Sequence, residues 1–209
     1  MLEAKPILVK NLKKISSVSI LALILVLSAG NLVHAEVTSM IPLGTLPQGL
    51  AYDSAKGEIF VANPAVNAVS VISDSTNVVI TTINVGSDPS EVAYDSGKGE
   101  IFVTNGLGRS VSVILDSNNT VVATVTVGND PQGMVYDFGK GEMFVTNAAD
   151  NTVSVISDSS NAVVATVDMV PQPNLDSSLT QAYSAAYDPE KGEIYGSYNR
   201  FTDGLSHKR

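Results

Sequence analysis

The chain has 209 residues, of which 44% are hydrophobic and 16% are charged, and its formal net charge is −9. This composition supplies enough apolar material for a folded core and argues against intrinsic disorder. Cysteine is absent, so disulfides, thiol chemistry and cysteine-ligated metals are excluded. Tryptophan is absent as well, and Val, Ile, Thr, Ser, Gly and Asn recur in short runs, which favours an all-β fold.

Residues 1–35 are typical of a secretory signal peptide. Four lysines precede an uncharged run at 15–29, and Val33 and Ala35 place small residues three before and one before a cleavage point. An uncleaved anchor is the alternative, but the strongly apolar part, 18–29, is short for the roughly 20 residues that cross a bilayer. We therefore expect an extracellular or cell-surface location, with membrane contact only through this segment before cleavage.

Cleavage after Ala35 would remove four lysines and one glutamate. The remaining chain, 36–209, would carry 8 basic and 20 acidic residues, a formal charge of −12. Because this balance repels phosphate backbones, we expect no nucleic-acid partner.

The chain contains an internal repeat with a period of 42 residues. The units are 44–85, 86–127 and 128–169, and the second and third are identical at 25 of 42 positions. A partial fourth unit follows at 170–209, where the repeat motif restarts after extra residues. A fixed period of this length indicates a repeat architecture that covers the expected domain at 36–209.

Each unit has the pattern of four short strands joined by hairpin turns. The first strand ends in Tyr-Asp, and a turn containing Lys-Gly-Glu follows it. The third strand alternates polar and apolar residues, and the fourth is rich in β-branched residues. The predicted second strands are 59–63, 101–105 and 143–147, and the predicted fourth strands are 78–85, 121–127 and 163–169.

Four antiparallel strands per unit predict one blade of a β-propeller, in preference to a sandwich or a β-solenoid. About four blade units are expected, the last one incomplete. Residues 37–43 align with the fourth strand of the next unit at an offset of 42. They are expected to form a lone outer strand, of the kind with which propellers close their ring.

The second strands also carry a family resemblance. Phe102-Val103-Thr104-Asn105 and its counterpart at 144–147 follow Lys-Gly-Glu and precede a Val-Ser-Val-Ile segment. This arrangement resembles the YVTN family of β-propeller repeats found in archaeal surface-layer proteins and related exported bacterial proteins. The resemblance implies a propeller commonly of seven blades, whereas this chain supplies about four. A compact four-blade ring, self-association that completes the propeller, and a truncated product of a longer gene remain open.

Catalytic groups are scarce in the repeats. Of the two histidines, His34 leaves with the signal peptide and His207 lies in the C-terminal tail. The repeats therefore offer no histidine-based triad or metal site, and we expect neither enzymatic activity nor a cofactor. The alternative is a propeller enzyme or cofactor carrier of the lactonase or haem-d1 kind, which the resemblance to propeller folds keeps open.

Three Asp-Ser segments invite a calcium hypothesis, at Asp74, Asp116 and Asp158. The same residue types nucleate hairpin turns, and one carboxylate per loop is thin for a cation site, so we predict turns and no metal. Asn118 begins an Asn-Asn-Thr sequence, the pattern of an N-glycosylation acceptor in an exported protein. The repeated Tyr and Phe residues at 52, 94, 136, 60, 102 and 144 are expected in the core.

The loops after the second strands differ in sequence from unit to unit, and variable loops on a uniform scaffold are where recognition usually resides. The alternative is that the asparagines there only cap turns. We expect a non-enzymatic surface module that binds a protein or glycan, or that packs into an envelope layer. The candidate binding residues are Asn63, Asn67, Asn105, Arg109, Asn147, Asp150 and Asn151.

Overall fold

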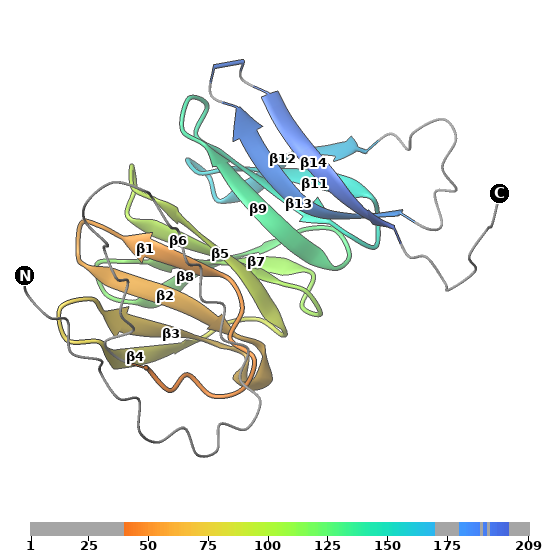
Figure 1. The fold of residues 1–209 in the computed structure, drawn as a ribbon. Helices are drawn as coiled ribbons and strands as arrows, with labels where there is room; N and C mark the ends of the chain where they lie inside the picture. Colours follow the sequence, from red (N-terminus) through yellow and green to blue (C-terminus); the bar gives the residue numbers. More distant parts are fainter. Residues whose placement is uncertain (1–39, 170–179, 189, 192, 201–209) are drawn as a thin grey trace, which may run out of the picture. The chain divides into compact units, whose positions relative to one another are not determined.

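The computed structural model describes residues 40–169, 180–188, 190–191 and 193–200, and it is all-β apart from one 3₁₀ turn, Pro64–Val66. The strands form three four-stranded antiparallel sheets and one two-stranded sheet (Figure 1). No helix within these residues has the length and apolar character needed to span a membrane.

The strands follow one another in chain order within every sheet. The first sheet contains β1 (Leu50–Asp53), β2 (Glu58–Asn63), β3 (Ala68–Ser73) and β4 (Val78–Asn84). The second contains β5 (Pro89–Asp95), β6 (Glu100–Asn105), β7 (Ser110–Leu115) and β8 (Thr120–Thr126). The third contains β9 (Pro131–Asp137), β10 (Glu142–Asn147), β11 (Thr152–Ser157) and β12 (Ala162–Asp168). The fourth contains β13 (Thr180–Asp188) and β14 (Glu193–Arg200).

Local sequence explains the tight turns. The glycine of each Lys-Gly-Glu segment has a positive φ, +66° at Gly57, +66° at Gly99 and +67° at Gly141. Glycine adopts this conformation at little cost in free energy because it has no Cβ. The aspartate that ends each first strand accepts hydrogen bonds from the turn's main chain, as when Asp53 Oδ1 accepts from Ala55 N at 2.8 Å. Each turn is therefore fixed by residues that recur in every unit.

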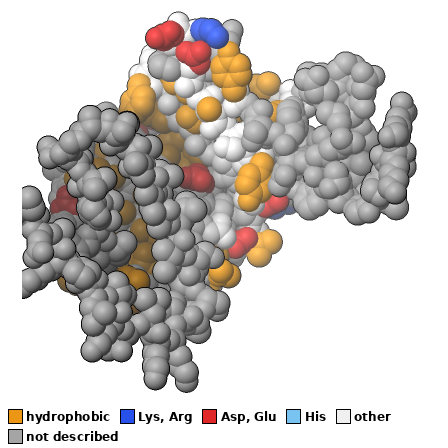
Figure 2. Space-filling view, in the orientation of Figure 1, with side chains coloured by type: hydrophobic (Ala, Val, Ile, Leu, Met, Phe, Trp, Pro, Cys, Tyr) orange, Lys and Arg blue, Asp and Glu red, His pale blue; other side chains and the backbone are white. Residues whose placement is uncertain are grey.

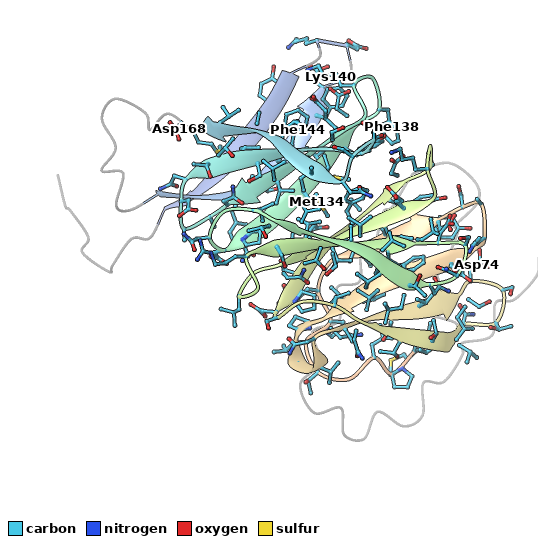
Figure 3. The ribbon with its side chains drawn as sticks, turned by 180° about the vertical axis from the view of Figure 1, so that it is seen from behind. Asp74, Met134, Phe138, Lys140, Phe144 and Asp168 are labelled. Carbon is cyan, nitrogen blue, oxygen red and sulfur yellow. The ribbon has the colours of Figure 1, made fainter. Side chains whose placement is uncertain are left out.

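Successive sheets pack face to face, and the first strand of each sheet contacts the first strand of the next: β1 with β5, β5 with β9 and β9 with β13. Two apolar clusters lie between them. One joins the first and second sheets around Phe60 and Ile101, and the other joins the second and third around Phe102 and Met143. Met134 lies in this second cluster (Figure 3).

We call the face of a sheet that packs on the next sheet its trailing face, and the opposite face its leading face. The ends also differ. The loop end carries the loops after the second strands and the connections between sheets. The turn end carries the tight hairpin turns.

The strand predicted at 37–43 is not formed over 40–43, and 37–39 lie outside the described residues. A lone strand needs a neighbouring edge for its main-chain groups, and the fourth sheet has no third strand among the described residues that could offer one. The signal peptide predicted at 1–35 also lies outside them. Of the aromatic residues predicted in the core, Phe60 and Phe102 are fully buried, Phe144, Tyr94 and Tyr136 are partly buried, and Tyr52 is 50% exposed.

Candidate functional site

The three asparagines that end the second strands are buried at the loop end. Asn63, Asn105 and Asn147 are at most 2% exposed. Each side-chain amide donates a hydrogen bond across to the third strand of its own sheet, to Ser70 Oγ (2.7 Å), Ser112 Oγ (3.0 Å) and Ser154 Oγ (2.9 Å). Burial leaves them no surface to present to a partner. We assign them to holding each sheet together, in place of the binding role predicted for them.

The other four predicted residues lie in the loops that follow. Asn67, Arg109 and Asp150 are exposed, and Asn151 is half-buried. Asn67, Arg109 and Asn151 occupy equivalent positions and share a left-handed main-chain conformation, with φ of 53°, 50° and 53°. The three loops thus present asparagine, arginine and asparagine at a matching backbone position.

Main-chain hydrogen bonds fix these loops in place. In the second sheet, Gly106 N donates to Asp88 O at 2.9 Å and Gly108 N donates to Ser87 O at 3.2 Å. In the third, Ala148 N donates to Asp130 O at 2.8 Å. These two loops are therefore each tied to the connection that enters their own sheet, and in all three four-stranded sheets the main-chain oxygen at position 67, 109 or 151 accepts a hydrogen bond from the residue after the fourth strand. Side chains can vary there without changing the backbone that displays them.

Asp150 is held as a charged group on this surface. Its two carboxylate oxygens accept from Asn129, from the main-chain N–H at 2.7 Å and from the side-chain amide at 2.6 Å. These bonds lower the pKa of Asp150, and the positive charge of Arg109 in the neighbouring loop lowers it further. An anionic group and a cationic group thus lie on adjacent loops.

A groove of about 570 Å³ adjoins these loops, between the outer parts of the second and third sheets. Its walls combine the Asp150 carboxylate with several hydroxyl groups and two valines, and its volume lies in the range of ligand sites. The lining residues are Thr126, Val127, Gly128, Asp150, Thr152, Ser154, Val163 and Thr166. Sequence reasoning identified only Asp150 among them, because the groove forms from two units that are separate in sequence.

A second, smaller cavity of about 160 Å³ lies where the first strands of the sheets converge. Equivalent positions of the four units line it, namely Gln48, Ser90, Gln132 and Tyr183, together with the residue after each one. Sequence reasoning missed these residues. The available signal was a polar residue or tyrosine at this one position of the repeat in every unit.

Glycine allows the strands to approach closely at this cavity. A Cβ on Gly49 would lie 2.6 Å from Ser90 O, and a Cβ on Gly133 would lie 2.6 Å from Ser184 Cα. The second unit has Glu91 at the equivalent position. Burial raises the pKa of this glutamate above its ordinary value, so the cavity contains a carboxyl group that is costly to ionise.

The turn end carries the three aspartates of the calcium hypothesis, one per sheet. Asp116 and Asp158 accept hydrogen bonds from Tyr94 and Tyr136 and lie near lysines of the preceding sheet. Within the described residues, no three His, Asp or Glu side chains gather as they would around a metal ion. Asn118 is exposed in its turn, and its Oδ1 accepts from Thr120 Oγ1 at 2.7 Å.

The sequence matches no protein-family model and no curated protein. Among solved structures, the chain is similar to hydrazine synthase from Kuenenia stuttgartiensis, with a TM-score of 0.59 and 18% identity over 74% of this chain and 49% of that one. It is also similar to the RRP9 WD40 repeats, with a TM-score of 0.56 and 15% identity over 66% of this chain and 41% of that one. The fold is that of a β-propeller.

These identities show a likeness of fold alone. The chain spans less than half the length of either structure.

Proposed function

We propose that this protein is an exported, non-enzymatic β-propeller module of the YVTN-repeat type, which binds a protein or glycan of the cell surface through its loop end. The observation that carries the proposal is the contrast between backbone and side chains in the three loops after the second strands. Their main chains are fixed by repeated hydrogen bonds, while their exposed side chains differ from loop to loop. A rigid display of varied side chains suits recognition.

The chemistry of the loops indicates what kind of partner fits. Val66 and Leu107 are 65% and 78% exposed, and Arg109 and Asp150 add one charge of each sign. The adjoining groove offers hydroxyl groups and a carboxylate that accepts hydrogen bonds. A polar partner with hydroxyl or amide donors and a small apolar patch, such as a glycan or a protein loop, complements this surface.

The described surface carries side chains of several kinds. Figure 2 shows acidic and hydrophobic side chains interspersed on the described part of the face it presents. The negative net charge of the chain disfavours anionic polymers as partners. This supports a neutral or cationic partner at the loop end.

Replacement of loop side chains tests the proposal. The exposed loop side chains are replaced together, as Leu107→Ala, Arg109→Asn and Asp150→Asn, which leaves the anchoring residues Gly106, Gly108 and Ala148 unchanged. Binding is measured on a glycan array and on immobilised envelope proteins. We expect binding to be lost and the thermal unfolding temperature to stay within about 3 °C, because the loop main chains keep their anchors. The matched control makes changes of the same kinds at exposed turn-end residues, Phe138→Ala, Lys140→Gln and Glu190→Gln, and it should bind normally.

Two results would contradict the proposal. One is unchanged binding after the exposed side chains of both loops are replaced. The other is loss of binding in the turn-end control alone, which would place recognition at the turn end of the sheets.

A further inference from the structure

The contacts between successive sheets share one polar arrangement at the turn end. Tyr94 of the second sheet interacts with Asp53 of the first sheet and donates to Asp116 of its own sheet at 3.4 Å. Lys56 of the first sheet lies 3.9 Å from the same Asp116. At each contact, the preceding sheet therefore contributes an aspartate and a lysine, which we call the supplying half. The following sheet contributes a tyrosine and a turn aspartate, which we call the receiving half.

The next contact repeats the arrangement. Tyr136 donates to Asp158 at 2.7 Å and interacts with Asp95 of the preceding sheet, and Lys98 lies 3.7 Å from Asp158. In both contacts the receiving aspartate is nearly covered, with 13% and 14% of the Asp116 and Asp158 side chains exposed. The arrangement is thus a recurring connector between sheets.

Half of this connector is exposed on the leading face of the first sheet. Tyr52 donates to Asp74 at 2.8 Å, but Tyr52 is 50% exposed and Asp74 is exposed too. Figure 3 labels Asp74 at a turn of this sheet. The aspartate and lysine of a preceding sheet would complete the receiving half.

The other half is exposed on the fourth sheet. Asp188 and Lys191 occupy the supplying positions, and they pair with each other at 3.6 Å, with 29% and 62% of their side chains exposed. The equivalent aspartates Asp53, Asp95 and Asp137 are fully buried. Where a following turn aspartate is present, as for Lys56 and Lys98, the lysine reaches forward to it instead.

Apolar side chains that are buried between sheets elsewhere are exposed at these two faces. Val92 and Met134 insert between sheets and are 4% and 9% exposed, whereas Leu50 at the equivalent position of the first sheet is 62% exposed. Ala186 of β13, equivalent to the packed Ala93, is also exposed. The leading face of the first sheet and the trailing face of the fourth sheet therefore both expose apolar side chains. The first of these faces carries the receiving half of the connector, and the second carries the supplying half.

We infer that the leading face of the first sheet docks on the trailing face of the fourth sheet of a second copy of this chain. Asp188 then approaches Tyr52 of the other copy, Lys191 approaches its Asp74, and Leu50 is covered. The occupant is a second copy because this chain itself exposes both matching halves in the matching register. Two such head-to-tail contacts, related by a twofold axis, close a dimer in which each chain uses both faces.

Sedimentation velocity of the full chain over a range of concentrations tests the inference. We expect a species at a defined multiple of the 21.8 kDa chain, dissociating on dilution. Leu50→Asp should abolish it, because a charge would be placed in the covered patch. The control Val122→Asp changes a residue of similar exposure (50%) on the outer strand β8, and it should leave the mass unchanged.

A charge exchange distinguishes a contact between two copies from a contact between the first and fourth sheets of one chain. Lys191→Glu and Asp74→Lys should each weaken association at least tenfold when alone. Mixing the two variants should restore it, because one contact then keeps the native pair and the other holds an exchanged pair. A chain that stays monomeric at every concentration, or a mixture that fails to reassociate, would overturn the inference.

Discussion

The interior contacts between sheets and the outer strand of the third sheet are built from the same sequence positions but differ in burial. Ile83 and Val125, on the trailing faces of the first and second sheets, are 7% and 6% exposed, whereas the equivalent Val167 of β12 is 53% exposed. The sheet that packs on this third face contacts β9 and β10, and β12 remains open. Burial in this fold thus depends on the neighbouring sheet, because the repeat itself is nearly the same.

The largest expected effect compares Val125→Asp with Val167→Asp. An aspartate at 125 would place an unpaired charge between two sheets, and we expect a loss of at least about 4 kcal/mol in the free energy of unfolding. The same change at 167 should cost less than about 0.5 kcal/mol, because the side chain is open to solvent. Urea denaturation followed by circular dichroism measures both. Equal losses at the two positions would show that β12 is covered in solution.

The strands, turns and fold class could be predicted from the sequence because they depend on local patterns. The Lys-Gly-Glu turns need a positive φ at glycine, and β-branched runs suit strands, so the 42-residue period was enough to place a four-stranded sheet in each of the three complete units. Contacts between units were harder to predict. The burial of Asn105, the exposure of Leu50 and the cavity beside Glu91 each depend on which sheet lies alongside, and one unit's sequence does not contain that information.

A second test examines the close approach of β9 and β13. In Gly133→Ala, the new Cβ would lie 2.6 Å from Ser184 Cα and 2.7 Å from Tyr183 O, so the strands must separate. We expect a cost of about 1–3 kcal/mol, with faster amide hydrogen exchange at 180–188. Gly97→Ala is the control, since its Cβ would meet only a side-chain oxygen of Asp95, at 3.2 Å. Unchanged exchange at 180–188 in Gly133→Ala would mean that the two strands are not held at this distance.

The third test removes single hydroxyl groups from the connector. Tyr94→Phe deletes a donor that serves carboxylates of two sheets, and we expect a loss of about 1 kcal/mol. Tyr52→Phe deletes the equivalent hydroxyl of the first sheet, where solvent replaces the lost bond, and it should cost no more than about 0.3 kcal/mol at concentrations where the chain is monomeric. Thermal unfolding of both variants in parallel checks the order. A larger loss of stability for Tyr52→Phe than for Tyr94→Phe in dilute protein would mean that Tyr52, and not Tyr94, lies in a buried contact.

The smallest expected effect concerns Glu91, the one carboxyl group in the small cavity between the first strands. Burial raises its pKa in the folded protein, so protonated Glu91 favours folding, and this contribution is present at low pH and lost as the pH rises through the raised value. Glu91→Gln should therefore raise the unfolding temperature by about 1–2 °C at pH 7 and leave it unchanged below about pH 4. Exposed Glu190→Gln, in the turn between β13 and β14, should show no such pH-dependent gain. If Glu91→Gln instead lowers stability at pH 7, the ionised carboxylate must be stabilised by a partner bound in the cavity, and the cavity would become a binding site in its own right.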